Sequence, residues 1–145
     1  MTLVLDASVV VKWLLSDPDK EAETKRATEL VQQILEGYQP VLQPVHWLVE
    51  VAAVLARLSP ASVQSDVARL QALEVPTTDS PQILVRACRL AVDLNQHLFD
   101  TLYHAVALET PDTTLITADD RYLASGAPLG RVMRLADWRP RPATS

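Results

Sequence analysis

Four carboxylates border or interrupt apolar segments of this chain. Asp6 follows the run TLVL, Glu50 lies within VHWLVEVAAVLARL, Asp100 is near the start of FDTLYHAVALE, and Asp119 follows TTLITA. An ionised side chain beside a core loses hydration that only a partner charge, a metal or dense hydrogen bonding replaces. Carboxylates gathered together also raise each other's pKa values unless a cation is present. Because hard oxygen ligands select Mg²⁺ or Mn²⁺, the four acids predict a divalent metal site.

Each acid also has a purely structural interpretation, which stays open at this point. Asp6 and Asp119 are each placed to cap a following helix, and Asp100 is placed to interact favourably with a helix dipole. Glu50 is harder to explain in this way, because it is the only polar residue between positions 47 and 56. Only His46 and Arg57 lie close enough in sequence to offset its charge.

Length and composition predict one globular domain. The chain has 145 residues, of which 48% are hydrophobic and 21% charged, which argues against disorder. No segment is long and apolar enough to cross a bilayer, and the first residues lack the basic leader of a signal peptide. We therefore expect a cytoplasmic protein without membrane contact. The net charge of −5 argues only weakly against a polyanionic substrate, because four of the 18 acidic groups are assigned to a metal.

The other reactive residue types favour structural interpretations. Cys88, the single cysteine, excludes an internal disulfide and is expected to be a small buried hydrophobe of a helix. The three histidines form no close metal-binding pair. His104 follows Asp100 by four residues and is expected on the surface of its helix or partly buried. Only three glycines are present and no phosphate-binding loop is formed, which leaves metal-assisted hydrolysis as the chemistry the residues favour.

Hydrophobic periodicity alternates between strand-like and helical segments, which predicts an α/β fold with a mostly parallel sheet covered on both faces. The predicted strands are residues 2–5, 39–42, 75–77, 113–117 and 131–135. The predicted helices are residues 8–15, 17–36, 44–58, 59–73, 80–95, 99–109 and 119–124. We predict a single domain over residues 1–138 and a flexible tail over 139–145.

This order of elements brings the four acids together. In open α/β sheets, ligands bind beyond the carboxyl ends of the strands, near the point where the strand order reverses. Asp6 and Asp119 each stand just past a predicted strand. Glu50 and Asp100 lie in the early turns of helices near the same edge. The acids are therefore expected to converge although they are far apart in sequence.

The segments LDASVVVKW, the one around Glu50, FDTLYHAVALE and LITADDRYL, in this order, resemble the PIN domain and specifically the VapC-type toxins of bacterial toxin-antitoxin pairs. The resemblance covers essentially the whole chain and implies a PIN-like three-layer sandwich. It implies an endoribonuclease whose Asp6, Glu50, Asp100 and Asp119 hold Mg²⁺ or Mn²⁺, with an RNA substrate, an antitoxin partner and a homodimer. The remaining matching positions are supporting residues: Ser8, Thr117 and Asp120.

One position departs from the family pattern, and two other functions compete with this interpretation. Ala53 stands where the family often has an asparagine, so it supplies no polar side chain. A phosphoryl-transfer or receiver-type domain would want a late lysine, but no lysine follows Lys25, and Ser8 replaces the second aspartate of the phosphatase motif. A non-catalytic PIN-like module that binds RNA or protein remains the main alternative, although all four acids are retained.

Overall fold

The computed structural model describes residues 1–15 and 23–142. Its strands are β1 (Thr2–Leu5), β2 (Gln43–Pro44), β3 (Thr77–Thr78), β4 (Thr113–Thr117) and β5 (Val132–Arg134). Its α-helices are α1 (Ala7–Leu14), α2 (Thr24–Leu35), α3 (Trp47–Leu58), α4 (Val63–Ala72), α5 (Pro81–Leu94), α6 (Leu98–Glu109) and α7 (Asp120–Gly126). Short 3₁₀ turns, η1 (Ala127–Leu129) and η2 (Leu135–Asp137), flank β5. The predicted α/β class is confirmed.

All strand pairs are parallel. β4 lies between β1 and β5, and β2 pairs separately with β3. A bridge between Leu3 and Val41 joins the two groups. The strand order therefore reverses between β1 and β4, because the chain leaves β1 toward β2 on one side and later fills the other side with β4. Asp6 and Asp119 follow these two strands, as the sequence predicted.

A side chain completes the junction between β1 and β2. The backbone N–H of Leu5 donates to Gln43 Oε1 at 2.8 Å, and Gln43 Nε2 donates to the Leu5 carbonyl oxygen at 2.8 Å. Gln43 is only 2% exposed, so its amide satisfies strand groups that water does not reach. This clamp fixes the end of β1 one residue before Asp6.

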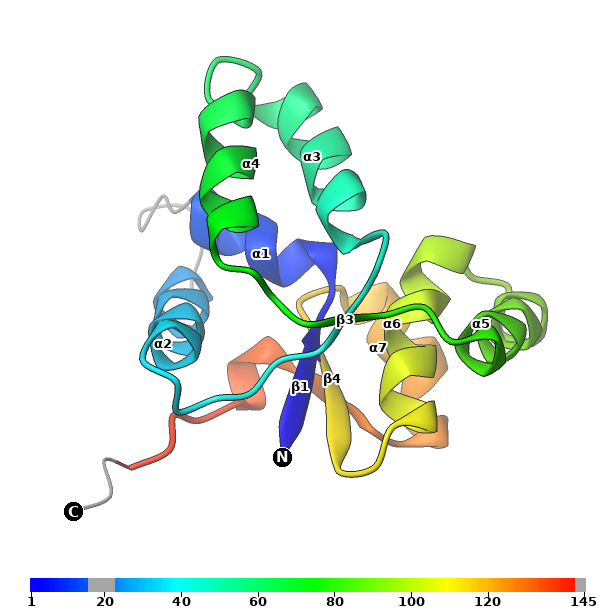
Figure 1. Ribbon diagram of the computed structural model, residues 1–145. Helices are drawn as coiled ribbons and strands as arrows, with labels where there is room; N and C mark the ends of the chain where they lie inside the picture. Colours follow the sequence, from blue (N-terminus) through cyan, green and yellow to red (C-terminus); the bar gives the residue numbers. More distant parts are fainter. Residues whose placement is uncertain (16–22, 143–145) are drawn as a thin grey trace.

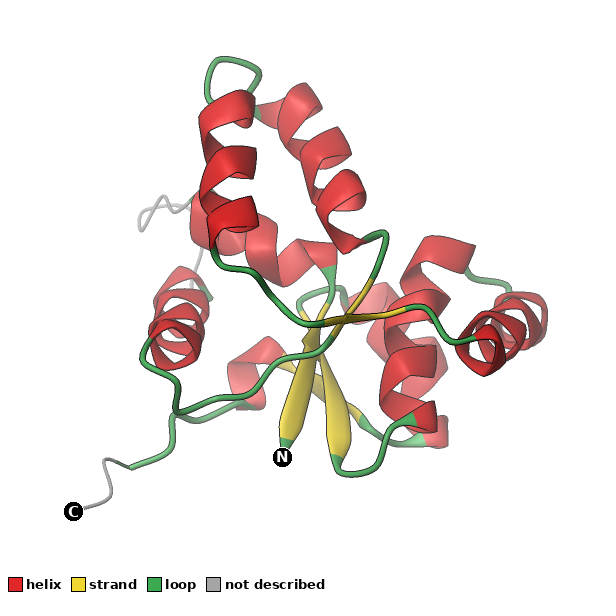
Figure 2. Ribbon diagram, viewed as in Figure 1, coloured by secondary structure: helices red, strands yellow, loops and turns green. Residues whose placement is uncertain are grey.

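Helices cover the sheet on both faces, as Figures 1 and 2 show. α1 and α2 pack together on one side, and α5 and α6 pack together on the other, where α6 contacts β1 and β4. α3 and α4 form a pair that extends beyond the strands (Figure 1). The part of the chain that is described contains no helix long and apolar enough to span a membrane.

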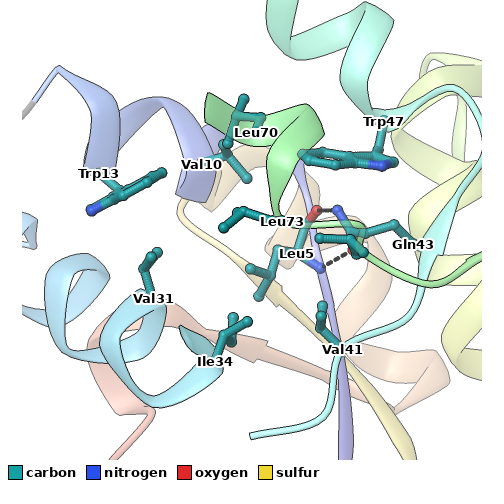
Figure 3. Close-up of a pocket in the computed structure, with 11 residues that line it drawn as sticks. Leu5, Val10, Trp13, Val31, Ile34, Val41, Gln43, Trp47, Leu70 and Leu73 are labelled. Carbon is teal, nitrogen blue, oxygen red and sulfur yellow. Dashed lines mark hydrogen bonds between the residues drawn. The ribbon is translucent and has the colours of Figure 1, made fainter. Parts of the chain in front are cut away.

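The core is continuous across these layers and includes Leu3, Val4, Leu115 and Ile116 from the central strands, all fully buried. A cavity of about 30 Å³ lies between β1, α1, α2 and α4, as Figure 3 shows. Its lining is apolar apart from Gln43, whose amide is already bonded to Leu5. A space of this size holds at most about one water molecule. It is a packing defect of the core and is too small to bind a substrate.

The second and third strands lie later in the chain than predicted. A strand was expected over residues 39–42, but β2 begins at Gln43. The following helix, α3, begins at Trp47 instead of residue 44. Two effects keep this segment extended: a residue before proline disfavours helical dihedral angles, and Gln43 is held against Leu5. β3 is likewise displaced to Thr77–Thr78, opposite β2. The predicted helix over 17–36 is observed from Thr24, and residues 17–22 lie outside the described part.

Two single-residue predictions are wrong. Cys88 is exposed, because α5 turns Ile83, Ala87 and Leu90 toward the core and leaves position 88 on the outer face. His104 was expected at the helix surface or partly buried, but it is fully buried, because α6 packs between α5 and the sheet. Both errors arise because helical spacing alone does not say how many sides of a helix are covered.

The end of the chain makes specific contacts. Arg141 donates its backbone N–H to Gln33 Oε1 at 3.1 Å, and Gln33 Nε2 donates to the Arg141 carbonyl oxygen at 3.1 Å. The Arg141 guanidinium also donates to the carbonyl oxygen of Met1 at 3.2 Å. A flexible tail was predicted from residue 139. These bonds hold its described part against α2, and residues 143–145 lie outside the described ranges.

Candidate metal and nuclease site

Asp6 is a buried carboxylate with several hydrogen bonds. It caps α1, and its Oδ1 accepts a bond from the backbone N–H of Ser8 at 2.9 Å. The Ser8 hydroxyl donates to Oδ1 and the Thr117 hydroxyl donates to Oδ2. Burial is the largest influence and raises the pKa of Asp6 from 3.8 to about 6, with Asp100 adding to the rise and the two hydroxyl groups opposing it. The predicted supporting positions Ser8 and Thr117 thus both contact this acid.

Asp119 caps α7 at the end of β4. Its Oδ1 accepts hydrogen bonds from the backbone N–H groups of Arg121 at 3.0 Å and Tyr122 at 3.2 Å. Thr117 Oγ1 accepts a bond from the Asp119 backbone N–H at 3.0 Å, so one hydroxyl links Asp119 to Asp6. The capping interpretation therefore holds for both aspartates. Capping does not exclude metal binding, since Oδ2 of Asp119 makes no hydrogen bond within the described residues.

Glu50 lies in the first turn of α3 with its side chain 18% exposed. His46 Nε2 stands 3.1 Å from Glu50 Oε2, one helical turn earlier. The same nitrogen is 3.2 Å from the Phe99 carbonyl oxygen, which accepts its proton. Oε2 is buried and has no hydrogen bond from any described residue. Of the two neighbours that the sequence offered to offset this charge, the structure places His46 in contact.

Asp100 lies in the first turn of α6, and its charge interacts with the charges of the other three acids. Burial raises its pKa most, followed by the negative charges of Glu50 and Asp119, while His97 and His46 oppose the rise. Asp100 in turn raises the pKa of Asp6. The charges of the four predicted acids are therefore linked through Asp100, although the acids come from four different helix N-termini. The partial positive charge at those termini favours the ionised carboxylates.

The carboxylates fit a hard divalent cation in their chemistry. They are oxygen donors of high charge, they repel one another, and one buried oxygen of Glu50 lacks a hydrogen bond. Within the described residues, however, no group of three or more histidine, cysteine, aspartate or glutamate side chains stands positioned to hold an ion. The acids interact through space without forming one shared group of ligands among the described residues.

Two buried polar atoms beside Glu50 also make no hydrogen bond of standard geometry with a described residue: His46 Nδ1 and the hydroxyl oxygen of Tyr103, which nevertheless lies close enough to interact with the Glu50 carboxylate. Tyr103 is fully buried, and burial together with Glu50, Asp6 and Asp100 raises the pKa of its hydroxyl far above the usual range. The hydroxyl is therefore neutral. Sequence reasoning missed Tyr103 as a member of this region. Its spacing of three residues after Asp100 placed it on the same side of α6 and was the available signal.

The third predicted supporting residue is set apart. Asp120 follows Asp119 but points outward, with its side chain 77% exposed and 3.3 Å from the Arg134 guanidinium. Ala53 is exposed and leaves the wall of α3 without a polar group at that position. Thus Ser8 and Thr117 touch an acid of the site, whereas Asp120 forms a surface ion pair.

A groove of about 630 Å³ opens beside the acids. Glu50 and Asp100 form part of its wall, and the other lining side chains come from the length of α3, from its first to its last turn, and from the start of α6: His46, Val49, Ala53, Val54, Arg57, His97 and Phe99. Among the larger described cavities it is the one that contains two of the four acids. A ligand in the groove would therefore contact the candidate site directly.

A family model described as the PIN domain matches residues 3–126, which include all four acids. The chain belongs to the PIN domain family. PIN domains are generally metal-dependent nucleases, and the parallel sheet flanked by helices fits a PIN-like sandwich. A comparison with curated proteins finds no match to the chain. The PIN fold thus accounts for the acidic region at the carboxyl ends of β1 and β4, and it supports a nuclease assignment.

Proposed function

We propose that this PIN-domain protein is a Mg²⁺- or Mn²⁺-dependent endoribonuclease, with Asp6, Glu50, Asp100 and Asp119 as the metal-binding residues. The observation that carries the proposal is the mutual influence of four acids from four helix N-termini at the switch point of the sheet. A structural role for each acid separately would not require them to gather where their charges oppose one another. A bound cation removes that opposition.

Different residues of the chain would have different roles in such a metal site. Ser8 and Thr117 fix both oxygens of Asp6, so this acid enters the site in one orientation. Asp119 is fixed by its cap on one oxygen and keeps the other available. Glu50 and Asp100 face the groove in which RNA would lie. When bound, a divalent ion supplies an activated water and neutralises charge on the phosphodiester, and one carboxylate accepts the proton of that water.

The nuclease proposal is tested by Asp100→Asn, which removes one charge with almost no change in side-chain volume. We expect RNA cleavage and growth inhibition on expression to be lost while the thermal unfolding transition is retained. The matched control is Asp93→Asn, on the exposed face of α5, which should cleave as the wild type does. Cleavage should stop in EDTA and return with added Mn²⁺. Cleavage by Asp100→Asn at the wild-type rate would remove this acid from the site.

The same experiment separates the enzyme from a non-catalytic PIN module. The absence of a preformed three-ligand cluster among the described residues is the observation that favours that alternative. If the wild-type protein binds RNA but never cleaves it with Mg²⁺ or Mn²⁺, the module is the better description.

We further propose that the protein is the toxin of a type II toxin-antitoxin pair and forms a homodimer. The support is the resemblance of its four acidic segments to VapC-type toxins together with PIN family membership. An antitoxin segment lying over the acids, with an arginine facing the carboxylates, would complement the negative charge there. Co-expression with a small neighbouring gene should yield a complex with suppressed cleavage. Failure of the two proteins to associate would refute the toxin assignment and leave the nuclease proposal intact.

A further inference from the structure

The groove beside the acids carries an aromatic surface that the proposed metal chemistry does not use. Phe99, the only phenylalanine of the chain, is 47% exposed at the start of α6. Its ring stacks on His46 with centroids 5.2 Å apart and planes inclined by 23°. His97 lies against the same ring at 5.1 Å with an inclination of 41°. Because the ring lies on the wall of the groove, a ligand that covers it gains the free energy of burying apolar surface.

The aromatic group is held in place from both ends. The Phe99 backbone N–H donates to His97 Nδ1 at 3.2 Å, which caps α6, and the Phe99 carbonyl oxygen accepts from His46 Nε2 at 3.2 Å. His46 also packs against the buried ring of Tyr103 at 5.0 Å. The ring of Phe99 is therefore preorganised: a ligand that stacks on it would not have to order a mobile side chain first.

The charge of the groove selects the kind of ligand. Arg57 lines it from α3, one further turn beyond Ala53, and His46 and His97 line it near Phe99. The acids Glu50 and Asp100 lie on the same wall. A flat aromatic face beside an arginine is the combination that holds unpaired nucleotides, whose bases stack on rings while arginine contacts phosphate. A duplex offers no free base face to such a platform.

We propose that Phe99, supported by His46 and His97, is a base-stacking platform that seats an unpaired nucleotide of an RNA strand next to the carboxylates, with Arg57 on a neighbouring phosphate. This inference rests on the proposed ribonuclease function and assigns the seating of the RNA strand to the ring of Phe99. The adjacency of Phe99 and Asp100 in the first turn of α6 couples the two: a base stacked on residue 99 holds its phosphodiester beside residue 100.

The first test replaces the ring while keeping an apolar side chain. A fluorescein-labelled oligouridine of about 12 nucleotides is titrated with protein in EDTA and followed by fluorescence anisotropy. We expect Phe99→Leu to bind about tenfold more weakly than wild type and Phe99→Trp to bind at least as well. The control is Tyr38→Leu, which removes another exposed aromatic ring, 53% exposed and outside the groove, and should not change binding.

Two further measurements distinguish stacking from other effects. The same oligouridine paired with oligoadenosine should bind wild type and Phe99→Leu equally, because its bases are not free. Arg57→Gln should reduce the slope of log affinity against log salt by about 0.7, whereas Phe99→Leu should leave that slope unchanged. In Mn²⁺, Phe99→Leu should raise KM for RNA cleavage about tenfold with a smaller effect on kcat, which separates it from loss of a metal ligand.

Each opposite result is decisive. Equal binding of oligouridine by wild type and Phe99→Leu would overturn the platform and leave the groove to a protein partner. Equal losses for single-stranded and duplex RNA would show a general disturbance of the groove and would also overturn it. If the wild-type protein cleaves RNA and Phe99→Leu has the same KM, the inference fails while the nuclease proposal stands. If the wild type neither binds nor cleaves RNA, both fail together.

Discussion

Two of the acid–histidine pairs that the sequence spaces four residues apart, His46 with Glu50 and Asp100 with His104, are used in opposite ways. His46 and Glu50 meet at 3.1 Å near the start of α3. Asp100 and His104 do not pair: His104 Nδ1 accepts a bond from the Tyr122 hydroxyl at 2.8 Å, and Nε2 donates to the Gly130 carbonyl oxygen at 2.8 Å. Burial lowers the pKa of His104, so the ring is neutral and both nitrogens are satisfied.

The two regions differ in how completely their buried polar atoms are bonded. Around His104 the ring nitrogens and the Tyr122 hydroxyl are all paired, and Gly126 lets the rings approach, since a Cβ there would stand 3.0 Å from Tyr122 Cε1. Around Glu50, three buried atoms lack hydrogen bonds from described residues: Glu50 Oε2, His46 Nδ1 and the Tyr103 hydroxyl oxygen. The other such atom, Thr24 Oγ1, lies close to the undescribed residues 16–22.

This difference separates a structural network from a binding region. Buried polar groups in folded proteins are nearly always paired, and each exception needs an explanation. The His104 network ties α6 to α7 and to Gly130, at the end of η1. The buried atoms near Glu50 that lack a hydrogen bond do not join elements in this way, and they are concentrated at the acids. The comparison therefore predicts opposite effects of substitution: stability should suffer in the first region, and activity in the second.

The largest effect is expected for Glu50→Gln. Losing the charge of a metal ligand should cost several kcal/mol of transition-state stabilisation, or about 1000-fold in the rate of RNA cleavage. The metal-free protein should keep or gain stability, because a buried charge is removed. Cleavage rates and thermal melts in EDTA measure the two effects. If the variant cleaves normally, or if it is strongly destabilised, Glu50 has a structural role and does not bind the metal.

A smaller effect is expected from the pH dependence of Asp6. Its pKa is raised from 3.8 to about 6, so the native state holds the proton more tightly than the unfolded state does. The corresponding stability is present below about pH 4 and is lost as the pH rises through about 6. In EDTA, the unfolding free energy of wild type minus that of Asp6→Asn should fall over this range by at most about 3 kcal/mol.

The titration of His104 does not affect that difference. Its lowered pKa contributes stability in the opposite direction, which rises with pH, but it does so in both proteins and cancels in the difference. Urea titrations at a series of pH values supply the curve. A difference that stays flat between about pH 4 and about pH 6 would show that the native state does not raise the pKa of Asp6 in the metal-free protein.

The smallest effects come from one chemical change made in both regions. Tyr122→Phe leaves His104 Nδ1 buried without a partner and should lower the unfolding free energy by about 1–2 kcal/mol. Tyr103→Phe removes a hydroxyl that makes no hydrogen bond of standard geometry with a described residue and should leave stability unchanged or raise it by about 1 kcal/mol. Urea denaturation of both variants in EDTA compares them directly. Equal losses would mean that the two regions do not differ.

Much of the architecture could be predicted from periodicity. β1 and β4 lie where the sequence placed them, and the helices carrying Glu50 and Asp100 were recognised. β2 and β3 were misplaced because two-residue strands carry no periodic signal and depend on the Gln43 clamp. The exposure of Cys88 and the burial of His104 were also missed, because each depends on what packs against a helix and not on the helix itself.

The sequence by itself determined which residues are able to act. The carboxylates embedded in apolar segments, the strand ends before Asp6 and Asp119, and the PIN-like order of motifs are all local features, since they depend on residue type and spacing. Only the tertiary structure decided how these residues are used. It turned His46 toward Glu50 and His104 away from Asp100, and it placed Phe99 in the groove. Such choices depend on contacts between residues far apart in the chain, for which identical local spacings carry no information.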